Sequence, residues 1–159
     1  MNSPSMPEKL QDIIEMFDLT PDRNDRYQLL IDYSDKFKPV QEQIATRPFP
    51  EDHRVPSCES QAFVFAEERS DGLLNFHFAV ENPNGISAKA ISAIMHDVTS
   101  GAQLDEILAI EPDIIFKFFN RDQLGIARSE GLRGIIKFVR FFARKQKERL
   151  QSSNSKVQF

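Results

Sequence analysis

Residues 62–80 have the sequence pattern of one β-hairpin, and helical patterns occupy much of the chain on both sides of it. Residues 62–68 are rich in aromatic and β-branched side chains, residues 70–72 form a Ser-Asp-Gly turn, and apolar side chains alternate over residues 74–80. This alternation is typical of paired strands. The sequence therefore predicts an α+β fold in which a small antiparallel sheet is packed by helices.

The helices are predicted from apolar side chains that recur every three or four residues, as on one face of an amphipathic helix. The predicted segments are residues 7–18, about 21–38, 86–98, 104–110 and a long closing helix through 132–142. Thr20 is expected to cap the second helix, which ends near Lys38 because Pro39 follows. We expect the third helix to cover the sheet.

Residues 39–56 are predicted to be an irregular connector, because they show little periodicity and contain three prolines before the one at position 56. The connector has room for a short strand near residues 53–55. No linker divides the 159 residues, so we expect residues 1–159 to form a single domain with a core over about residues 7–150. The polar tail, residues 151–159, is expected to be frayed.

The chain has one cysteine, Cys58. A lone thiol excludes an intramolecular disulfide and the groups of thiolate ligands that hold zinc or iron–sulfur clusters. Cys58 is therefore either a small buried apolar residue or a nucleophile displayed on a loop. Pro56 and Ser57 favour a turn, and regular apolar alternation begins only at Ala62, so Cys58 falls on a turn that enters the first strand. This position favours the nucleophile.

Other residues with possible chemical roles give weaker signals. The three histidines lie in separate segments without the close spacing of metal ligands, so no metal site is expected. His53 is near enough in sequence to act on Cys58 as a base or proton shuttle, although a histidine in a loop is more often exposed surface. A cysteine-protease site would need a histidine and an amide beside Cys58, which the sequence neither shows nor forbids. Residues 82–85, Asn-Pro-Asn-Gly, could offer backbone N–H groups to an anion, and ordinarily form a turn and cap.

The net charge of −4 is unevenly distributed, since residues 112–159 carry 4 acidic and 11 basic side chains. Many of these bases recur at helical spacing beside apolar residues, as on a solvated helix face. The acidic balance and the absence of basic residues interleaved with aromatics argue against a nucleic-acid partner. No apolar run reaches the roughly 20 residues that span a bilayer, and no export signal is evident. We therefore expect no membrane partner and a cytoplasmic location, or a plastid one if the chain comes from a photosynthetic eukaryote.

Two ordered sequence boxes stand out, residues 55–63 around Cys58 and residues 127–132 around Arg128. Both resemble motifs of the SufE family of sulfur-acceptor proteins. Residues 55–63, Val-Pro-Ser-Cys-Glu-Ser-Gln-Ala-Phe, are similar to the family's Val-x-Gly-Cys-x-Ser-x-Val-Trp box. Residues 127–132, Ala-Arg-Ser-Glu-Gly-Leu, are similar to its Ser-Arg-x-x-Gly-Leu run before the last helix. The chain departs from the family where Ser57 replaces glycine, Phe63 replaces tryptophan, and Asn82 and Asn84 occupy a turn that is often acidic.

The resemblance implies a fold shared with iron–sulfur scaffold proteins of the IscU type, but not their function, because a scaffold needs several cluster ligands and this chain has one thiol. It implies that Cys58 accepts a persulfide sulfur from a SufS-type cysteine desulfurase, stimulates that enzyme, and delivers sulfur to a SufBCD-type scaffold complex. The chain would then be a sulfur-transfer partner and not a stand-alone enzyme. It would hold no cofactor, because pyridoxal phosphate belongs to the desulfurase. Arg128 would hold the cysteine loop or stabilise an anionic sulfur, or else be a surface charge.

Two other classes of function stay open from the sequence. One is a non-catalytic interaction domain, in which Cys58 is incidental and the charged surfaces dock partners. The other is a hydrolase that uses Cys58 as its nucleophile. The neutral side chains of Asn82 and Asn84 would favour a thiolate over the acids usual in the family, provided that they approach Cys58.

Overall fold

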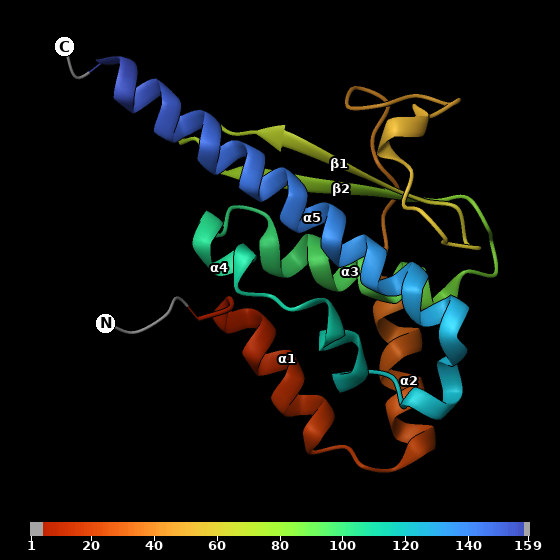
Figure 1. Cartoon of the computed structure of the whole chain (residues 1–159). Helices are drawn as coiled ribbons and strands as arrows, with labels where there is room; N and C mark the ends of the chain where they lie inside the picture. Colours follow the sequence, from red (N-terminus) through yellow and green to blue (C-terminus); the bar gives the residue numbers. More distant parts are fainter. Residues whose placement is uncertain (1–4, 158–159) are drawn as a thin grey trace.

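The computed structural model describes residues 5–157, with side chains to residue 153. Seven helices and strands and two 3-10 turns follow one another along this part of the chain (Figure 1). They are α1 (Glu8–Asp18), α2 (Arg23–Asp35), the 3-10 turn η1 (Glu51–His53), β1 (Ala62–Glu68), β2 (Leu74–Val80), α3 (Ile86–Thr99), α4 (Leu104–Leu108), the 3-10 turn η2 (Pro112–Lys117) and α5 (Arg121–Val157). The predicted α+β architecture is confirmed. Within these residues, no helix is both long enough and apolar enough to cross a membrane.

The second helix is shorter than predicted at both ends. Asp22, and not Thr20, is its N-cap, because the Asp22 carboxylate accepts a hydrogen bond of 3.0 Å from the backbone N–H of Asp25. Thr20 instead belongs to the end of α1, where its hydroxyl donates to the carbonyl of Met16 at 2.8 Å. The helix ends at Asp35, before the predicted end near Lys38.

The hairpin has the predicted antiparallel pairing, with Ala62 opposite Val80 and Glu68 opposite Leu74. The short strand expected near residues 53–55 is reduced to one isolated bridge between Arg54 and Phe63. The 3-10 turn η1 precedes this bridge and keeps the chain from extending further.

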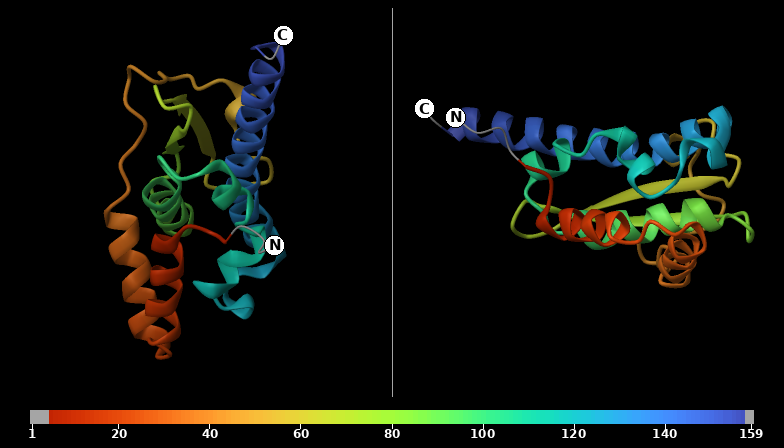
Figure 2. Two further views of the ribbon diagram at one scale, coloured as in Figure 1. Left: turned by 90° about the vertical axis from the view of Figure 1, so that its left-hand side faces the viewer. Right: turned by 90° about the horizontal axis from the view of Figure 1, so that it is seen from below.

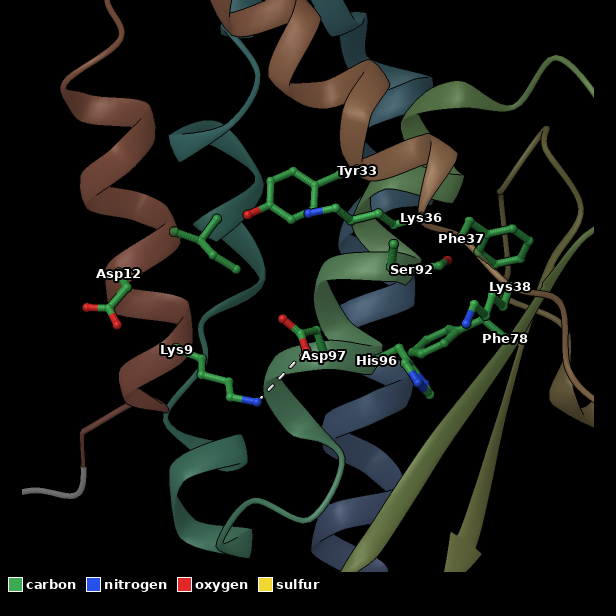
Figure 3. Close-up of a pocket in the computed structure, with 12 residues that line it drawn as sticks. Lys9, Asp12, Tyr33, Lys36, Phe37, Lys38, Phe78, Ser92, His96 and Asp97 are labelled. Atoms are coloured by element: carbon green, nitrogen blue, oxygen red, sulfur yellow. Dashed lines mark ion pairs between the residues drawn. The ribbon is translucent and has the colours of Figure 1, made fainter.

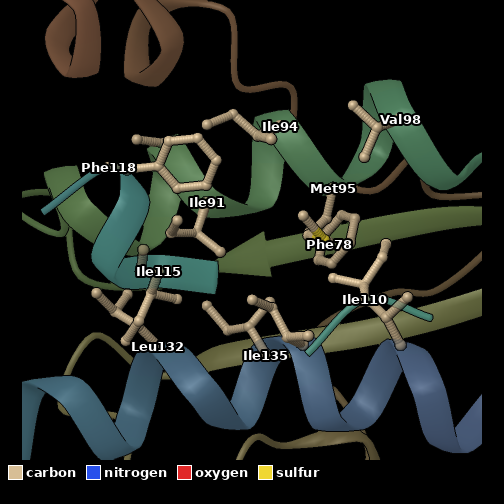
Figure 4. Packing of buried hydrophobic residues seen from close by; sticks show 14 of the residues in the cluster. Phe78, Ile91, Ile94, Met95, Val98, Ile110, Ile115, Phe118, Leu132 and Ile135 are labelled. Atoms are coloured by element: carbon tan, nitrogen blue, oxygen red, sulfur yellow. The ribbon is translucent and has the colours of Figure 1, made fainter. Parts of the chain in front are cut away.

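One face of the hairpin packs into the main hydrophobic core. This face presents alternate residues of each strand, including Val64, Phe76 and Phe78, all of them buried. In Figure 4, Phe78 lies among apolar side chains of the surrounding helical elements, namely Ile91, Met95, Ile115, Leu132 and Ile135. Because full burial of one such side chain contributes about 1.5–3 kcal/mol, this cluster holds the hairpin against α3 and α5.

The other face of the hairpin is covered by the connector. Phe63 and Phe65 form a second cluster in which the Phe49 ring lies 5.2 Å and 5.6 Å from theirs, measured between centroids. The backbone N–H of Val40 donates to the carbonyl of Phe78 at 2.8 Å. Figure 2 shows the first part of the connector running along the side of the hairpin away from α5, before the chain crosses over to η1 beside α5. The irregular segment is therefore a packed layer that covers Phe63 and Phe65.

The closing helix α5 begins earlier than predicted and contains a kink. Gly125 has φ 70° and ψ 173°, so the segment is two helices joined at this glycine. A positive φ is accessible to glycine without steric cost. The hydroxyl of Ser129 donates to the carbonyl of Gly125 at 2.7 Å and supports the bend. Arg128 lies within the first turn after the kink.

The far end of α5 is also longer than predicted. The sequence predicts a frayed tail from Gln151, but the helix extends to Val157, and residues 158–159 lie outside the described residues. The side-chain amide of Gln146 donates to the carbonyl of Gly72 at 2.8 Å, and Arg149 pairs with Glu68. These contacts with the hairpin hold the last turns of α5, which have few apolar side chains.

Basic side chains of α5 do not all face solvent, in contrast to what the sequence pattern indicates. Arg133 donates to Asp113 at 2.7 Å and to Glu130 at 2.8 Å. The hydrogen bond to Asp113 is the main reason why the pKa of Arg133 lies above its ordinary value. Lys147 donates to Asp105 at 2.7 Å. These pairs join α5 to η2 and α4.

The observed cap of α2 leads to a stability prediction. Asp22→Ala should lower the free energy of unfolding by about 1 kcal/mol and the melting temperature by about 2–4 °C, because one N–H of the first turn loses its acceptor. Asp22→Asn should retain most of the stability, since asparagine caps equally well. Thermal denaturation of both variants and of Thr20→Val provides the comparison. A larger loss in Thr20→Val than in Asp22→Ala would contradict the cap assignment.

Candidate functional site

Cys58 lies in a loop, residues 54–61, that leads into β1. The backbone N–H of Val55 donates to the carbonyl of Ala62 at 2.9 Å, which closes the base of the loop. The N–H of Gln61 donates to the carbonyl of Cys58 at 3.0 Å, which folds the loop into a tight turn. Cys58 thus occupies the position that the sequence predicted, on a turn that enters the strand.

The residue before Cys58 and the third residue after it adopt left-handed backbone conformations. Ser57 has φ 61° and Gln61 has φ 53°. For residues with a Cβ this conformation costs roughly 1–2 kcal/mol, a cost that glycine avoids. The structure therefore explains the glycine that the family has where this chain has Ser57. It also follows that other contacts must hold the loop in this conformation.

Two glycines of α5 provide such contacts. A Cβ added at Gly131 would lie 3.0 Å from the Cα of Cys58 and 3.1 Å from the carbonyl oxygen of Ser57. A Cβ added at Gly134 would lie 2.6 Å from a methyl carbon of Val55. The contact at Gly134 is shorter than real Cβ atoms essentially ever show, and those at Gly131 are tighter than most real Cβ contacts. A side chain at either position would therefore push against the loop. Gly131 belongs to the second sequence box, so the two boxes meet in the structure.

The thiol is sheltered in this arrangement. Cys58 is only 8% exposed and borders the main core. It lines a small hollow of about 110 Å³ between the loop, the start of α3 and the first part of α5. Cys58 therefore lies on the expected loop, but its side chain is buried and not displayed to solvent.

Arg128 lines the same small hollow. Its side chain comes from the first turn after the kink at Gly125. Among the described residues it makes no hydrogen bond or ion pair. Of the described residues that line the hollow, Glu59 is the one other charged residue. The structure therefore brings together the two residues that the sequence boxes single out, and leaves the guanidinium able to meet an anion.

The turn at residues 82–85 forms another wall of the hollow. Asn82 and Asn84 both line it, so the neutral side chains that distinguish this chain from the family do approach Cys58. The Asn82 side chain accepts from the N–H of Asn84 at 2.9 Å, and the Asn82 backbone N–H donates to the carbonyl of Ser60 at 3.1 Å. The ordinary role of this segment, a turn before α3, is the one observed, and it also supports the cysteine loop.

His53 does not act on the thiol in this structure. Its Nδ1 lies 2.9 Å from the carbonyl oxygen of Val64, and its ring stacks on Phe65 and Phe142 at centroid distances of 4.8 Å and 5.8 Å. Among the residues described here, no histidine lines a hollow that contains Cys58. Over the same ranges, no group of three or more His, Cys, Asp or Glu side chains is arranged to hold a metal ion. A hydrolase that uses a Cys–His pair therefore receives no support.

A second hollow, of about 320 Å³, adjoins the first one. The two share Asn84, Ile86, Ser87 and Arg128. Arg23 and Tyr27 of α2 also line this second hollow. Sequence reasoning missed them, because nothing in the pattern of α2 indicates that its first turn packs beside the cysteine site.

A larger groove, of about 630 Å³, lies elsewhere, between α1, the end of α2 and α3 (Figure 3). Lys9 and Asp97 form an ion pair of 3.9 Å across it. Burial, and to a lesser extent the charge of Asp97, raises the pKa of the Tyr33 hydroxyl. None of residues 54–61, all of which the structure describes, lines this groove. It is therefore separate from the thiol site.

Comparison with known proteins agrees with the geometry. Residues 11–143 match the model of the SufE family, described as an Fe-S metabolism associated domain. The chain is 28% identical over 137 residues to SufE-like protein 1, chloroplastic/mitochondrial, of Arabidopsis thaliana. This match covers 84% of the chain but only 34% of the relative, so the chain spans about a third of that protein's length.

A solved structure has the same fold. It is the solution structure of a hypothetical protein from Thermus thermophilus, with a TM-score of 0.70 and 23% sequence identity. The match covers 90% of this chain and 98% of the other. At this level of identity the likeness supports the fold and carries no information on activity.

Gly131→Ala should release the cysteine loop. The added methyl group clashes with Cys58 and Ser57, and overpacking of this kind costs about 1–3 kcal/mol, which corresponds to roughly a fivefold or greater shift toward an open loop. The rate at which iodoacetamide modifies Cys58 in the native protein should rise by that factor. The rate in denaturant is the control, because the thiol is fully exposed there in every variant. An unchanged native rate would contradict the close packing of the loop on α5.

Proposed function

This chain belongs to the SufE family, and we propose that it accepts a sulfane sulfur on Cys58 from a cysteine desulfurase of the SufS type. It then passes the sulfur to an iron–sulfur scaffold complex of the SufBCD type and stimulates the desulfurase by removing its product. The main support is the position of the single thiol, on a strained loop in a hollow that also contains Arg128.

The chemistry of the transfer is thiol–disulfide exchange. The Cys58 thiolate attacks the outer sulfur of a persulfide on the desulfurase, the S–S bond of that persulfide breaks, and the desulfurase cysteine leaves as a thiolate. Cys58 then carries the sulfur as its own persulfide. A second exchange with a scaffold thiol restores Cys58. No oxidant or reductant is needed, and the only cofactor in the sequence of events is the pyridoxal phosphate of the desulfurase.

Burial of Cys58 is consistent with a protected carrier. A persulfide is easily oxidised, and other thiols reduce it. A sheltered resting position therefore limits loss of the carried sulfur between partners. The loop strain at Ser57 and Gln61 lowers the cost of leaving the resting position, because an extended loop releases it. The loop would move outward when a partner docks.

The surface around the hollow suits contact with another protein. Ile86 lines the hollow and is 38% exposed, and Ile126, two residues before Arg128, is 87% exposed. Under this proposal, the two exposed isoleucines would offer apolar contacts to the docking partner. Arg128 would stabilise the negative charge on the sulfur as it moves between the two proteins.

One observation favours a second candidate, a non-catalytic interaction domain. Cys58 is as buried as a packing residue, and such a domain would need no more from it. The experiments below distinguish this candidate from sulfur transfer, because they ask whether the thiol reacts.

Cys58→Ser should fold normally, bind the desulfurase and accept no sulfur, because a serine hydroxyl does not act as the nucleophile in this exchange. Wild-type protein and the variant are each incubated with desulfurase, pyridoxal phosphate and cysteine, and then weighed intact. Wild-type protein should gain the mass of one sulfur atom, removable by reductant, and the variant none. A destabilised variant that still relays sulfur would make Cys58 a packing residue and end the proposal.

Arg128→Ala should reduce stimulation of the desulfurase about tenfold or more, because a hydrogen bond to a charged group contributes about 1.5–3 kcal/mol. Its free energy of unfolding should change by less than about 0.5 kcal/mol, since the side chain makes no ion pair among the described residues. Arg144→Ala is the matched control, an exposed arginine farther along the same helix. Equal stimulation by the two variants would remove Arg128 from the site.

A further inference from the structure

The hollow next to the cysteine site has an unusual set of charges. Among the residues that the structure describes, three arginines line it, Arg23, Arg26 and Arg128, and no aspartate or glutamate does. The carboxylate of Asp122 lies nearby, 3.8 Å from Nη2 of Arg23, and is largely exposed to solvent. The hollow is therefore cationic, although the protein as a whole carries a net charge of −4.

The three arginines are held in different ways. Arg26 is committed to the fold, because it donates to the carbonyls of Phe17 and Lys117 at 2.6 Å and 2.7 Å. Arg23 is only oriented, because the Gln123 carboxamide oxygen, in the orientation that satisfies its neighbours, accepts from Nε at 2.7 Å and from Nη2 at 3.1 Å. Within the described part of the chain, its Nη1 has no partner, and neither has the Arg128 guanidinium.

Available guanidinium donors in a hollow of this size select for a small anion. A guanidinium presents parallel N–H groups that match the two oxygens of a carboxylate. Tyr27 and Phe119 add apolar walls, and Asn120 adds an amide. A volume of about 320 Å³ lies at the lower end of the range for small-molecule sites.

The position of the hollow adds a second requirement for its ligand. Arg128 lines both this hollow and the hollow of Cys58, so a ligand bound to the arginines reaches toward the thiol. A molecule with a carboxylate at one end and a thiol at the other would satisfy both ends. Free cysteine and short cysteine-containing peptides have this form.

We propose that this cationic hollow binds the carboxylate of a low-molecular-weight thiol, and that this thiol is a direct acceptor of the sulfur that Cys58 carries. The inference rests on the proposed function, in that Cys58 must first hold a persulfide. The acceptor thiolate attacks the outer sulfur of the Cys58 persulfide, and the inner sulfur leaves as the Cys58 thiolate. The acceptor departs as a small persulfide. One S–S bond forms and one breaks, so no outside electrons are required.

Anion recognition can be measured without any sulfur transfer. Native protein is alkylated at Cys58 with iodoacetate, which carries a carboxylate, and with iodoacetamide, which does not. The ratio of the iodoacetate rate to the iodoacetamide rate should be about fivefold higher in native than in denatured wild-type protein, as expected for charge pairing at a partly exposed site. Arg23→Gln and Arg128→Gln should each lower the ratio toward the denatured value.

A matched control comes from the separate groove of Figure 3. Lys38→Gln removes the same charge from the protein but lies in that groove, which includes no residue of the cysteine loop. It should leave the alkylation ratio unchanged. An equal drop in all three variants would show that net charge sets the ratio, and would overturn the proposed site.

The acceptor role is tested on protein whose Cys58 has been loaded with inorganic polysulfide, so that no desulfurase is involved. Loss of the sulfur is followed by intact mass with cysteine, and with cysteamine, which has the same thiol arm without the carboxylate. Wild-type protein should react about fivefold faster with cysteine, and Arg23→Gln at equal rates with both. If a desulfurase failed to load Cys58, that result would count against the proposed function alone. The preference for cysteine over cysteamine is measured on protein loaded with polysulfide and does not depend on the desulfurase.

Two results would overturn the inference. One is equal reaction of cysteine and cysteamine with loaded wild-type protein. The other is an Arg23→Gln variant that keeps the preference for cysteine but takes up sulfur from the desulfurase more slowly. That second result would assign the hollow to an acidic segment of the partner protein and not to a small thiol.

Discussion

The whole candidate site depends on the packing of the cysteine loop against α5 at two glycines, which have no side chain. Gly131 and Gly134 lie about one helical turn apart, and their lack of side chains lets Val55, Ser57 and Cys58 lie close to the helix. This contact buries the thiol, holds the left-handed conformation of Ser57 and brings Arg128, about one turn earlier on α5, to the same hollow. Removing the contact would disperse three features that the proposed chemistry needs together.

The candidate site combines a buried thiol with a strained loop backbone. A nucleophilic thiol must be reached by its partner, and an 8% exposed side chain is poorly placed for that. The strained backbone on both sides of Cys58 offsets part of the free energy that burial provides, which under the proposed function would favour opening of the loop when a partner docks. The hairpin beside it, by contrast, is firmly packed, with both of its faces covered.

Charge near the thiol is arranged by neighbouring elements more than by the loop itself. The turn before α3 contributes amides where acids are usual in the family, α5 contributes Arg128, and α2 contributes Arg23 from the far side of the adjoining hollow. Basic residues farther along α5 pair with carboxylates such as Asp113 and Asp105 and serve the fold. Arg23 and Arg128, which keep unpaired N–H groups among the described residues, therefore line the hollows to which the two proposals assign an anionic sulfur and a carboxylate.

Local sequence patterns were sufficient to predict most of the secondary structure and the place of Cys58 on a turn, and the two boxes singled out Cys58 and Arg128. Such features follow from residue periods, turn-forming residues and short motifs that act over a few positions, so they can be predicted locally. Three other features could be learned only from the packed fold: Cys58 is buried, His53 stacks on Phe65 away from the thiol, and Arg23 approaches the site. The same holds for the continuation of α5 past Gln151, which follows the contacts of Gln146 and Arg149 with the hairpin. Each of these depends on side chains that meet from distant elements, and no local pattern records which of them will meet.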